Sequence, residues 1–314
     1  MSDDLTPAEP RRQRSSALRR SWFVGLIAVV LTVAVLSFKL WLSQPPVDRW
    51  DEIDFVNRFG GGSLVIAGGG HLPPEIRRRF LALAGGPERA TIVIVPAFVA
   101  DAVQVESLCE TWRKLGVQRV QVLQARSRDE SNLAAFGFPL DEATGVWLSG
   151  GQQERLSALY AGTQVEAKLQ SLIERGGVVG GTSAGAAAMT KVMIEQGVEE
   201  ATEGRGFDLF RDAIVDQHFL RRSRLNRMIG LLDAYPDRVA FGIDESTALV
   251  VQVPKGRLGV IGSSYVVACV PKTEAGTRRF EIMKPGDHID LAGLRDGRTK
   301  VSSPADLDSL LSDE

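Results

Sequence analysis

Short runs of Val, Ile, Leu and Ala alternate with amphipathic stretches over most of this 314-residue chain. Strands that are apolar on both faces are typical of a parallel sheet that is buried on both sides. The stretches between the earlier runs have helical spacing, so the alternation predicts an α/β fold. The apolar runs are residues 63–67, 90–96, 119–123, 145–148, 177–180, 213–215, 239–243, 248–253 and 264–270. The helical stretches are residues 74–84, 102–115, 153–160 and 163–175.

The order of these elements predicts a doubly wound, mostly parallel sheet with helices on both faces. The later strands follow one another after short turns, so we expect an antiparallel C-terminal extension. Glycine-rich turns follow three of the strands, at Gly68-Gly69-Gly70, Gly150-Gly151 and Gly180-Gly181. Loops after parallel strands meet at one edge of the sheet, where ligands bind. We therefore expect the three turns to lie near one another.

Composition excludes some classes of function. A formal net charge of −2 provides no global basic field that would attract nucleic acid. The two cysteines, Cys109 and Cys269, cannot form a disulfide framework, and neither has neighbours at zinc-ligand spacing. Both are expected to be buried apolar side chains. No metal or organic cofactor is expected.

Residues 22–42 form an almost wholly apolar run in which Lys39 is the only charge. As a helix the run would span about 30 Å, the thickness of a bilayer core, so it predicts one transmembrane helix. By the positive-inside rule, the arginines before it place the N-terminus in the cytoplasm and the rest of the chain outside. A cleaved signal peptide is the alternative, but no small-residue cleavage site follows the run. The arginines are Arg11, Arg12, Arg14, Arg19 and Arg20.

These features predict five parts, with the large domain extracytoplasmic and tethered by a single-pass anchor. The parts are a cytoplasmic basic tail (1–21), a transmembrane anchor (22–42), a linker (43–59), a catalytic domain (60–275) and a C-terminal extension (276–314).

The segment from Gly181 to Gly185 fits the pattern G-x-S-x-G, with Ser183 at its centre. It follows a strand-like run and precedes the helix-like stretch 186–195, which is the context of a nucleophile elbow. Small residues allow a sharp turn that exposes the Ser183 hydroxyl, and the N–H of Ala184 can serve as an oxyanion donor. A phosphate-binding turn is the alternative, although there is no lysine where a P-loop requires one.

The chain has three histidines, His71, His218 and His288. His218 directly follows the predicted strand 213–215, at the edge of the sheet where ligands bind, so we expect it to be the general base. His71 follows the first glycine-rich turn and is the alternative. His288 is expected in a surface turn.

A third group should hold the imidazole in one tautomer. Glu245 comes at the end of another apolar run, where burial of a carboxylate is energetically unfavourable unless the group has a binding partner or a catalytic role. Asp244, Asp216 and Glu203 are the alternatives.

Together, the motifs resemble the cyanophycinase family of serine peptidases, relatives of aspartyl dipeptidase with a class I glutamine-amidotransferase-like fold. The resemblance covers roughly residues 60–275 and rests on residues 180–186, 216–219 and 242–248 and on the arginines after His218. It implies a Ser–His–Glu triad of Ser183, His218 and Glu245 that acts through an acyl-enzyme.

The resemblance also implies a Gly-Gly-Asp-Gln turn over the active site. Here that turn reads Gly150-Gly151-Gln152-Gln153, with Gln152 in place of the acidic residue. An oxyanion hole is expected from the N–H groups of Ala184 and of Gly150 or Gly151. The implied substrate-binding residues are Gln153, Asp216, Gln217, Arg222, Arg224 and Arg227.

Cyanophycinases hydrolyse an arginyl-polyaspartate polymer to β-aspartyl-arginine dipeptides. Guanidinium groups bind carboxylates in a bidentate manner, which suits an aspartate backbone. A solvated basic helix face is the alternative for the arginines. The expected partners are a peptide or polyaspartate-type substrate and the membrane, with a homodimer as a further option and no nucleic acid. The alternative functions are a dipeptidase or general peptidase of the same superfamily, or a non-catalytic envelope module that binds acidic peptides.

Overall fold

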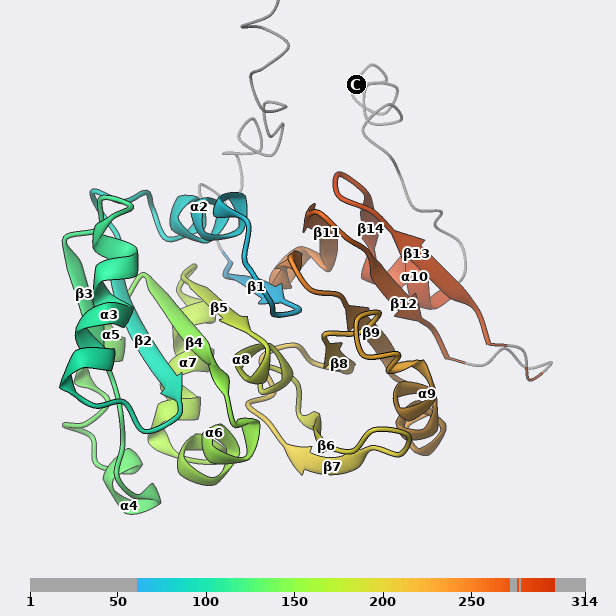
Figure 1. Ribbon diagram of the computed structural model, residues 1–314, viewed down its shortest axis with the longest axis horizontal. Coiled ribbons are helices and arrows are strands. Elements are labelled where there is room, and N and C mark those ends of the chain that lie inside the picture. Colours follow the sequence, from blue (N-terminus) through green and yellow to red (C-terminus); the bar gives the residue numbers. More distant parts are fainter. Residues whose placement is uncertain (1–60, 272–275, 277, 297–314) are drawn as a thin grey trace, which may run out of the picture. The chain divides into compact units, whose positions relative to one another are not determined.

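The computed structural model describes residues 61–271, 276 and 278–296, which form an α/β fold around a mixed sheet (Figure 1). The eight strands of this sheet lie in the order β14-β11-β10-β1-β5-β4-β2-β3. Strands β1, β5, β4, β2 and β3 run parallel, whereas β10, β11 and β14 continue the sheet in antiparallel fashion. The strands are β1 (Ser63–Ala67), β2 (Thr91–Ala97), β3 (Arg119–Val122), β4 (Gly145–Gly151), β5 (Val178–Thr182), β10 (Thr247–Gln252), β11 (Arg257–Gly262) and β14 (His288–Asp290).

A second sheet and a hairpin complete the β-structure of the described residues. The second sheet has the order β13-β12-β9-β8, in which only β8 and β9 are parallel. Strands β6 and β7 pair as a separate antiparallel hairpin. The bounds are β6 (Val192–Gln196), β7 (Thr202–Arg205), β8 (Ala213–Gln217), β9 (Val239–Ile243), β12 (Val266–Cys269) and β13 (Phe280–Met283).

Helices cover both faces of the large sheet because its central strands are apolar on both sides. In β1, Leu64 and Ile66 belong to one buried cluster, whereas Val65 belongs to the cluster on the opposite face. The first cluster includes side chains of α6 and α7, and the second includes side chains of α2 and α3. The helices are α2 (Pro74–Leu83), α3 (Ala102–Arg113), α4 (Arg128–Ser131), α5 (Phe138–Glu142), α6 (Gln153–Tyr160), α7 (Gln164–Glu174), α8 (Ala184–Ala187), α9 (Leu225–Ala234), α10 (Leu291–Asp296) and the 3-10 turn η3 (Val253–Lys255).

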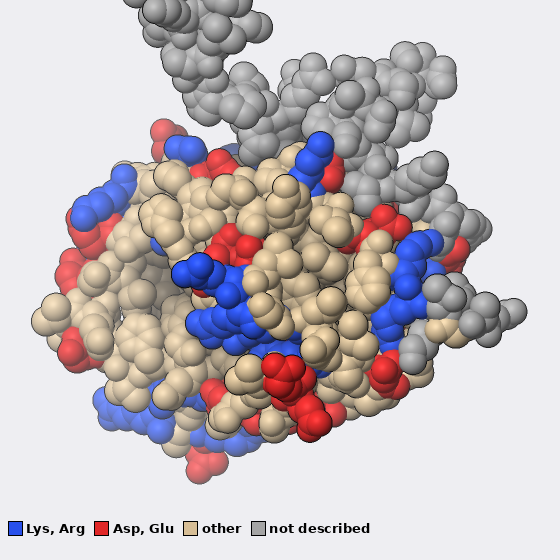
Figure 2. Space-filling view, turned by 45° about the vertical axis from the view of Figure 1, so that its right-hand side comes forward, with Lys and Arg blue, Asp and Glu red and all other residues tan. Residues whose placement is uncertain are grey.

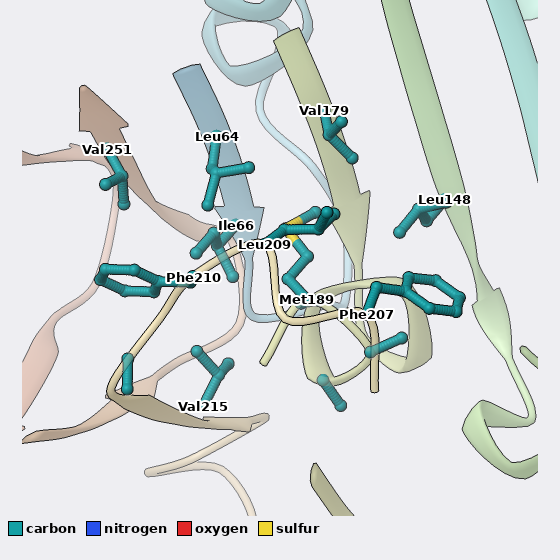
Figure 3. Packing of buried hydrophobic residues seen from close by; sticks show 14 of the residues in the cluster. Leu64, Ile66, Leu148, Val179, Met189, Phe207, Leu209, Phe210, Val215 and Val251 are labelled. Atoms are coloured by element: carbon teal, nitrogen blue, oxygen red, sulfur yellow. The ribbon is translucent and has the colours of Figure 1, made fainter. Parts of the chain in front are cut away.

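A connection between α8 and β8 closes the core next to the turn that carries Ser183. Figure 3 shows Phe207, Leu209 and Phe210 packed with Met189 against Ile66 and other side chains of the large sheet. This packing fixes the position of α8 relative to the sheet.

The α/β class is confirmed, and each apolar run predicted as a strand overlaps a strand of the structure. The large sheet has the predicted parallel part, and the expected antiparallel extension is β10, β11 and β14, which continue the sheet beyond β1. The helix predicted over 186–195 is only the short α8, after which the chain enters β6. Strands β13 and β14 fall within the predicted C-terminal extension and pair with β12 and β11.

The predicted membrane anchor requires a correction. The apolar run 22–42 lies outside the described residues, and in the part of the chain that is described no helix combines the length and apolar character needed to cross a bilayer. The described residues therefore do not support the predicted transmembrane helix, or the single-pass, extracytoplasmic localisation that depended on it.

Candidate active site

Three predicted residues meet where strands β5, β8 and β9 end. Ser183 directly follows β5, His218 directly follows β8, and Glu245 lies two residues beyond β9. The Ser183 Oγ lies 2.9 Å from His218 Nε2, and His218 Nδ1 lies 2.6 Å from Glu245 Oε1. This is the hydrogen-bonded order of nucleophile, base and orienting acid that covalent catalysis uses.

The backbone at Ser183 is strained in the way that a nucleophile elbow requires. Its φ and ψ are 52° and −112°, and it caps the start of α8. The flanking glycine Gly185 is needed because a Cβ there would lie 2.3 Å from the carbonyl oxygen of Leu148. The strand, the sharp turn and the helix therefore follow directly from the small residues of the motif.

The environment of His218 favours the neutral imidazole. Its side chain is buried, and burial lowers its pKa below the ordinary value. The hydrogen bond that His218 donates to Glu245 opposes this by raising the pKa, whereas the positive charge of Arg222 lowers it further. Because the Glu245 carboxylate accepts a hydrogen bond from Nδ1–H, the lone pair of Nε2 faces Ser183.

The predicted oxyanion residues surround Ser183. The Cα of Gly150 is so close that an added Cβ would lie 3.5 Å from the Cβ of Ser183. Gly151 has a φ of 144° and packs on Ala97, where a side chain would meet the backbone. Ala184 is buried and is the first residue of α8, so its N–H has no acceptor within the helix.

The arginines after His218 differ in their environments. Arg227 is buried and binds the fully buried carboxylate of Asp216 through Nε, at 2.7 Å, and through Nη2. Its remaining nitrogen, Nη1, donates to the carbonyl of Gly197 between β6 and β7. All three guanidinium nitrogens of Arg227 are thus bound to the protein itself.

Arg224 is half-buried at the start of α9. Its Nη1 donates to the carbonyl oxygen of Gln217 at 2.7 Å and to the side-chain oxygen of Gln217 at 2.9 Å. Burial lowers the pKa of Arg224 to about 10, although the Asp216 carboxylate acts in the opposite direction. Arg222, by contrast, is exposed and makes no side-chain hydrogen bond or ion pair with the described residues. On the face in Figure 2, basic side chains lie in several separate groups, and the group near the centre has acidic side chains above and below it.

Gln153, the first residue of α6, contacts the β6–β7 hairpin. Its amide donates to the backbone carbonyls of Ile194 and Glu195 in β6. Among the described residues, Gln153 and Arg227 therefore hold two parts of the β6–β7 hairpin against the site.

The alternative acids make other contacts. Asp244 accepts hydrogen bonds from the Arg221 N–H and the Ser264 hydroxyl, and Glu203 accepts one from the Tyr235 hydroxyl. The alternative base His71 is exposed, and His288 lies in β14 rather than in a surface turn. Within the described ranges, no group of three or more His, Cys, Asp or Glu side chains is arranged to hold a metal ion.

The sequence also matches known proteins. The family model described as Peptidase family S51 matches residues 64–258, which is more than half of the chain. The chain belongs to peptidase family S51. It is accordingly a serine-type peptidase, and the family predicted from the motifs is confirmed.

Two curated relatives of this S51 peptidase are cyanophycinases. The protein from Synechococcus elongatus is 33% identical over 254 residues, which cover 76% of this chain and 78% of the relative. The protein from Trichormus variabilis is 34% identical over 207 residues, covering 63% and 68%. A solved structure of a peptidase from an acI-B1 Actinobacterium has the same fold, with a TM-score of 0.58, 22% identity and coverage of 74% of this chain and 97% of that one.

Two features of this S51 site were missed by reasoning from the sequence. The fork between Arg227 and Asp216 makes both side chains part of the protein interior, although both were predicted to bind substrate. The only available signal was that Asp216 ends an apolar run, where an unpaired carboxylate is unfavourable. The second feature is the contact of Gly69 with the imidazole of His218. The glycine-rich turn was expected at this edge of the sheet, but its partner could not be read from spacing.

Proposed function

We propose that this S51 peptidase hydrolyses aspartyl peptide bonds of arginyl-polyaspartate, as cyanophycinases do, with Ser183 as the nucleophile. The observation that carries this proposal is the relay from Ser183 through His218 to Glu245, with heavy-atom distances of 2.9 and 2.6 Å. The relation to proteins named cyanophycinase supports the choice of substrate.

In the proposed reaction, His218 Nε2 takes the hydroxyl proton as Ser183 Oγ bonds to the carbonyl carbon of the scissile amide. Glu245 keeps the imidazole in the required tautomer and stabilises the imidazolium ion that forms. His218 then donates the proton to the leaving nitrogen, and the C–N bond breaks. A water molecule, deprotonated by the same imidazole, attacks the acyl-enzyme ester and releases the acid and Ser183.

The negative charge on the carbonyl oxygen in the tetrahedral intermediate needs hydrogen-bond donors. We assign this role to the N–H of Ala184 and an N–H of the Gly150-Gly151 turn. The N–H of Ser183 is not available, because it donates to the carbonyl of Ala67 at 3.1 Å. Loss of one such donor typically lowers kcat by about 100- to 1,000-fold.

Substrate carboxylates are assigned to Arg222, with Arg224 beside it. Arg222 is exposed, and its backbone N–H donates to the carbonyl oxygen of His218 at 3.0 Å, so the residue lies beside the proposed base. A guanidinium group forms two parallel hydrogen bonds with a carboxylate, which gives orientation as well as affinity. Arg227, Asp216 and Gln153 act indirectly in this assignment, by holding the walls of the site.

The test is to incubate the purified full-length chain with arginyl-polyaspartate and with a panel of α- and β-aspartyl dipeptides. We expect β-aspartyl-arginine from the polymer with the wild type and none with the Ser183→Ala variant. Cleavage of dipeptides without cleavage of the polymer would instead identify a dipeptidase. Binding of the polymer without any product would identify a non-catalytic module, and equal activity of the variant would disprove the assigned nucleophile.

A further inference from the structure

Three consecutive carbonyl groups at the end of β1 each accept a hydrogen bond from a different segment of the site. The donors are backbone N–H groups at or next to the three residues of the relay. The bonds are Ser183 N–H to Ala67 O (3.1 Å), His218 N–H to Gly68 O (2.7 Å) and Ser246 N–H to Gly69 O (3.0 Å). One short stretch of backbone therefore contacts all three segments.

The residues that donate these bonds are conformationally strained. Ser183, His218 and Ser246 have φ values of 52°, 48° and 59°, which L-residues rarely adopt. Each such residue costs about 1–3 kcal/mol and persists only where the surroundings fix it. The acceptor carbonyls lie at the end of β1 and directly after it, and β1 lies in the middle of the large sheet, between β10 and β5. The N–H of Gly68 also donates to the carbonyl of Thr247 in β10 at 2.9 Å, which holds the start of the turn in place.

The same turn also packs directly on the relay side chains. A Cβ built on Gly69, whose φ is 105°, would lie 2.4 Å from Cε1 and 2.5 Å from Nε2 of His218. A Cβ on Gly70, whose φ is 69°, would lie 2.8 Å from Oε2 of Glu245. Only hydrogen atoms fit between this backbone and the side chains. The imidazole cannot tilt toward the turn without a clash, which leaves its Nε2 directed at Ser183.

We propose that the turn Ala67–Gly70 is the positioning element of the site. Its carbonyls hold the three strained turns, and Gly69 is the residue that fixes the plane of the His218 ring. This inference rests on the catalytic roles proposed for Ser183, His218 and Glu245. Gly69 contacts the base rather than the substrate, so it is a positioning residue and not a catalytic one.

The matched pair for testing this is Gly69→Ala and Gly176→Ala. Gly176 has a similar left-handed φ of 93°, but a Cβ there meets nothing within 4 Å. Both substitutions introduce backbone strain, and only the first introduces the clash with His218. We expect kcat to fall about 100-fold in Gly69→Ala, with KM within a few-fold, because misplacement of a reacting group by about 1 Å has that effect. Gly176→Ala should keep the wild-type kcat, and equal kcat values in the two variants would overturn the proposal.

The tautomer of the His218 ring, measured by NMR, distinguishes a loss of ring positioning from a general disturbance of the fold. The chain has only three histidines, so ¹⁵N-histidine labelling resolves the ring of His218 by NMR after assignment with a His218→Ala sample. We expect the wild type and Gly176→Ala to show the single Nδ1–H tautomer, and Gly69→Ala to show a mixture. A wild-type ring signal in Gly69→Ala would contradict the inference.

A double-mutant cycle tests the contact even if Gly69→Ala does not fold or the proposed substrate is wrong. In the His218→Ala background the ring is absent, so Gly69→Ala should lower Tm much less than it does in the wild type. The same decrease in both backgrounds, or loss of folding in both, would show that the clash is not with His218. An inactive wild type with a positive cycle would disprove the proposed function and leave the contact established.

Discussion

Arg227 binds both carboxylate oxygens of Asp216, and the exposed fractions of the two side chains are only 2% and 0%. The pair lies directly before the proposed base, since Asp216 is two residues from His218. Arg227 was predicted to bind substrate. Its buried fork with Asp216 gives it a structural role, and the two roles predict different effects of substitution.

Arg227→Met should destabilise the protein, because it leaves the Asp216 carboxylate buried without its main partner. Breaking a buried ion pair from one side typically costs about 3–5 kcal/mol. We expect the free energy of unfolding, measured by urea denaturation followed by circular dichroism, to fall by about that amount.

Arg222→Met is the matched control for this substitution, because Arg222 is exposed and makes no ion pair with the described residues. It should change the free energy of unfolding by no more than about 0.5 kcal/mol. If Arg227→Met instead unfolded like the wild type and only raised KM, the buried fork would be irrelevant to stability and a substrate-binding role would be favoured.

Glu245→Gln tests the orienting acid. The amide can donate to His218 Nδ1, which would place the proton on Nε2 and remove the base from Ser183. The corresponding change in a serine protease triad lowers kcat by about 10⁴-fold. We expect a decrease of about 10³- to 10⁴-fold in aspartyl-peptide hydrolysis, with little change in Tm, measured by product release under saturating substrate.

Asp244→Asn is the control for the orienting acid, since the two residues are neighbours and both were candidates from the sequence. The Asp244 carboxylate accepts hydrogen bonds from the Arg221 N–H and from the Ser264 hydroxyl, so it contacts these two segments rather than the imidazole. Its amide variant should keep kcat within about tenfold of the wild type. A larger loss in Asp244→Asn than in Glu245→Gln would exchange the roles of the two acids.

The strands and turns that carry the candidate site residues were largely predictable, because neighbouring residues in the sequence determine them. The strand before Ser183 is a continuous apolar run, and the Gly-x-Ser-x-Gly pattern contains its own turn, so both could be read from neighbouring residues. Strand β7 was missed because it is short and polar, with exposed residues at most positions, whereas the buried apolar residues 192–194 of β6 were assigned to the end of a predicted helix. Residues 186–195 were read as one helix because the alanines suit a helix and nothing local marks the end of α8.

Side-chain partners were predictable only where a motif dictates them. Ser183, His218 and Glu245 were expected to converge because each follows a strand, and they do meet. The expected reason, a shared edge of one sheet, was wrong, because β5 belongs to the large sheet whereas β8 and β9 belong to the second sheet. The partners of Arg227 and Gln153 depend on where the hairpin lies, and long-range packing determines this position. The local sequence does not distinguish an arginine that forms a bidentate ion pair with a buried carboxylate from an arginine that binds a substrate carboxylate.

The pH dependence of kcat/KM should report the low pKa of His218. Burial lowers the pKa of its imidazole, so the neutral, proton-accepting form persists to more acidic pH than for an ordinary histidine, whose pKa is about 6.5. The acid limb of the profile should therefore have a midpoint below about pH 6.5.

The positive charge of Arg222 contributes to the lowered pKa of His218. Arg222→Gln should consequently raise the pKa of His218 and move the acid limb to higher pH, whatever it does to KM.

Arg221→Gln is the control for the pH measurement, because it removes an exposed charge one residue away along the chain. Its acid limb should coincide with that of the wild type. An unchanged limb in Arg222→Gln, or an equal shift in Arg221→Gln, would show that the pKa of His218 does not respond to Arg222 in particular.

Gln153→Leu tests whether the β6–β7 hairpin is held against the turn that follows β4. The wild-type amide donates to the carbonyls of Ile194 and Glu195, and leucine keeps the size of the side chain without the donor. One net hydrogen bond of about 1 kcal/mol corresponds to roughly fivefold more frequent local opening. Hydrogen exchange at the amides of residues 192–205 should accelerate by about that factor, with exchange in β1 and β5 unchanged.

Gln196→Leu, which removes only an exposed hydrogen bond to Glu154, should leave the exchange within about twofold of the wild type. Equal acceleration in the two variants would mean that the hairpin is held by its own strand pairing and by Arg227, and that Gln153 is free to turn toward a substrate.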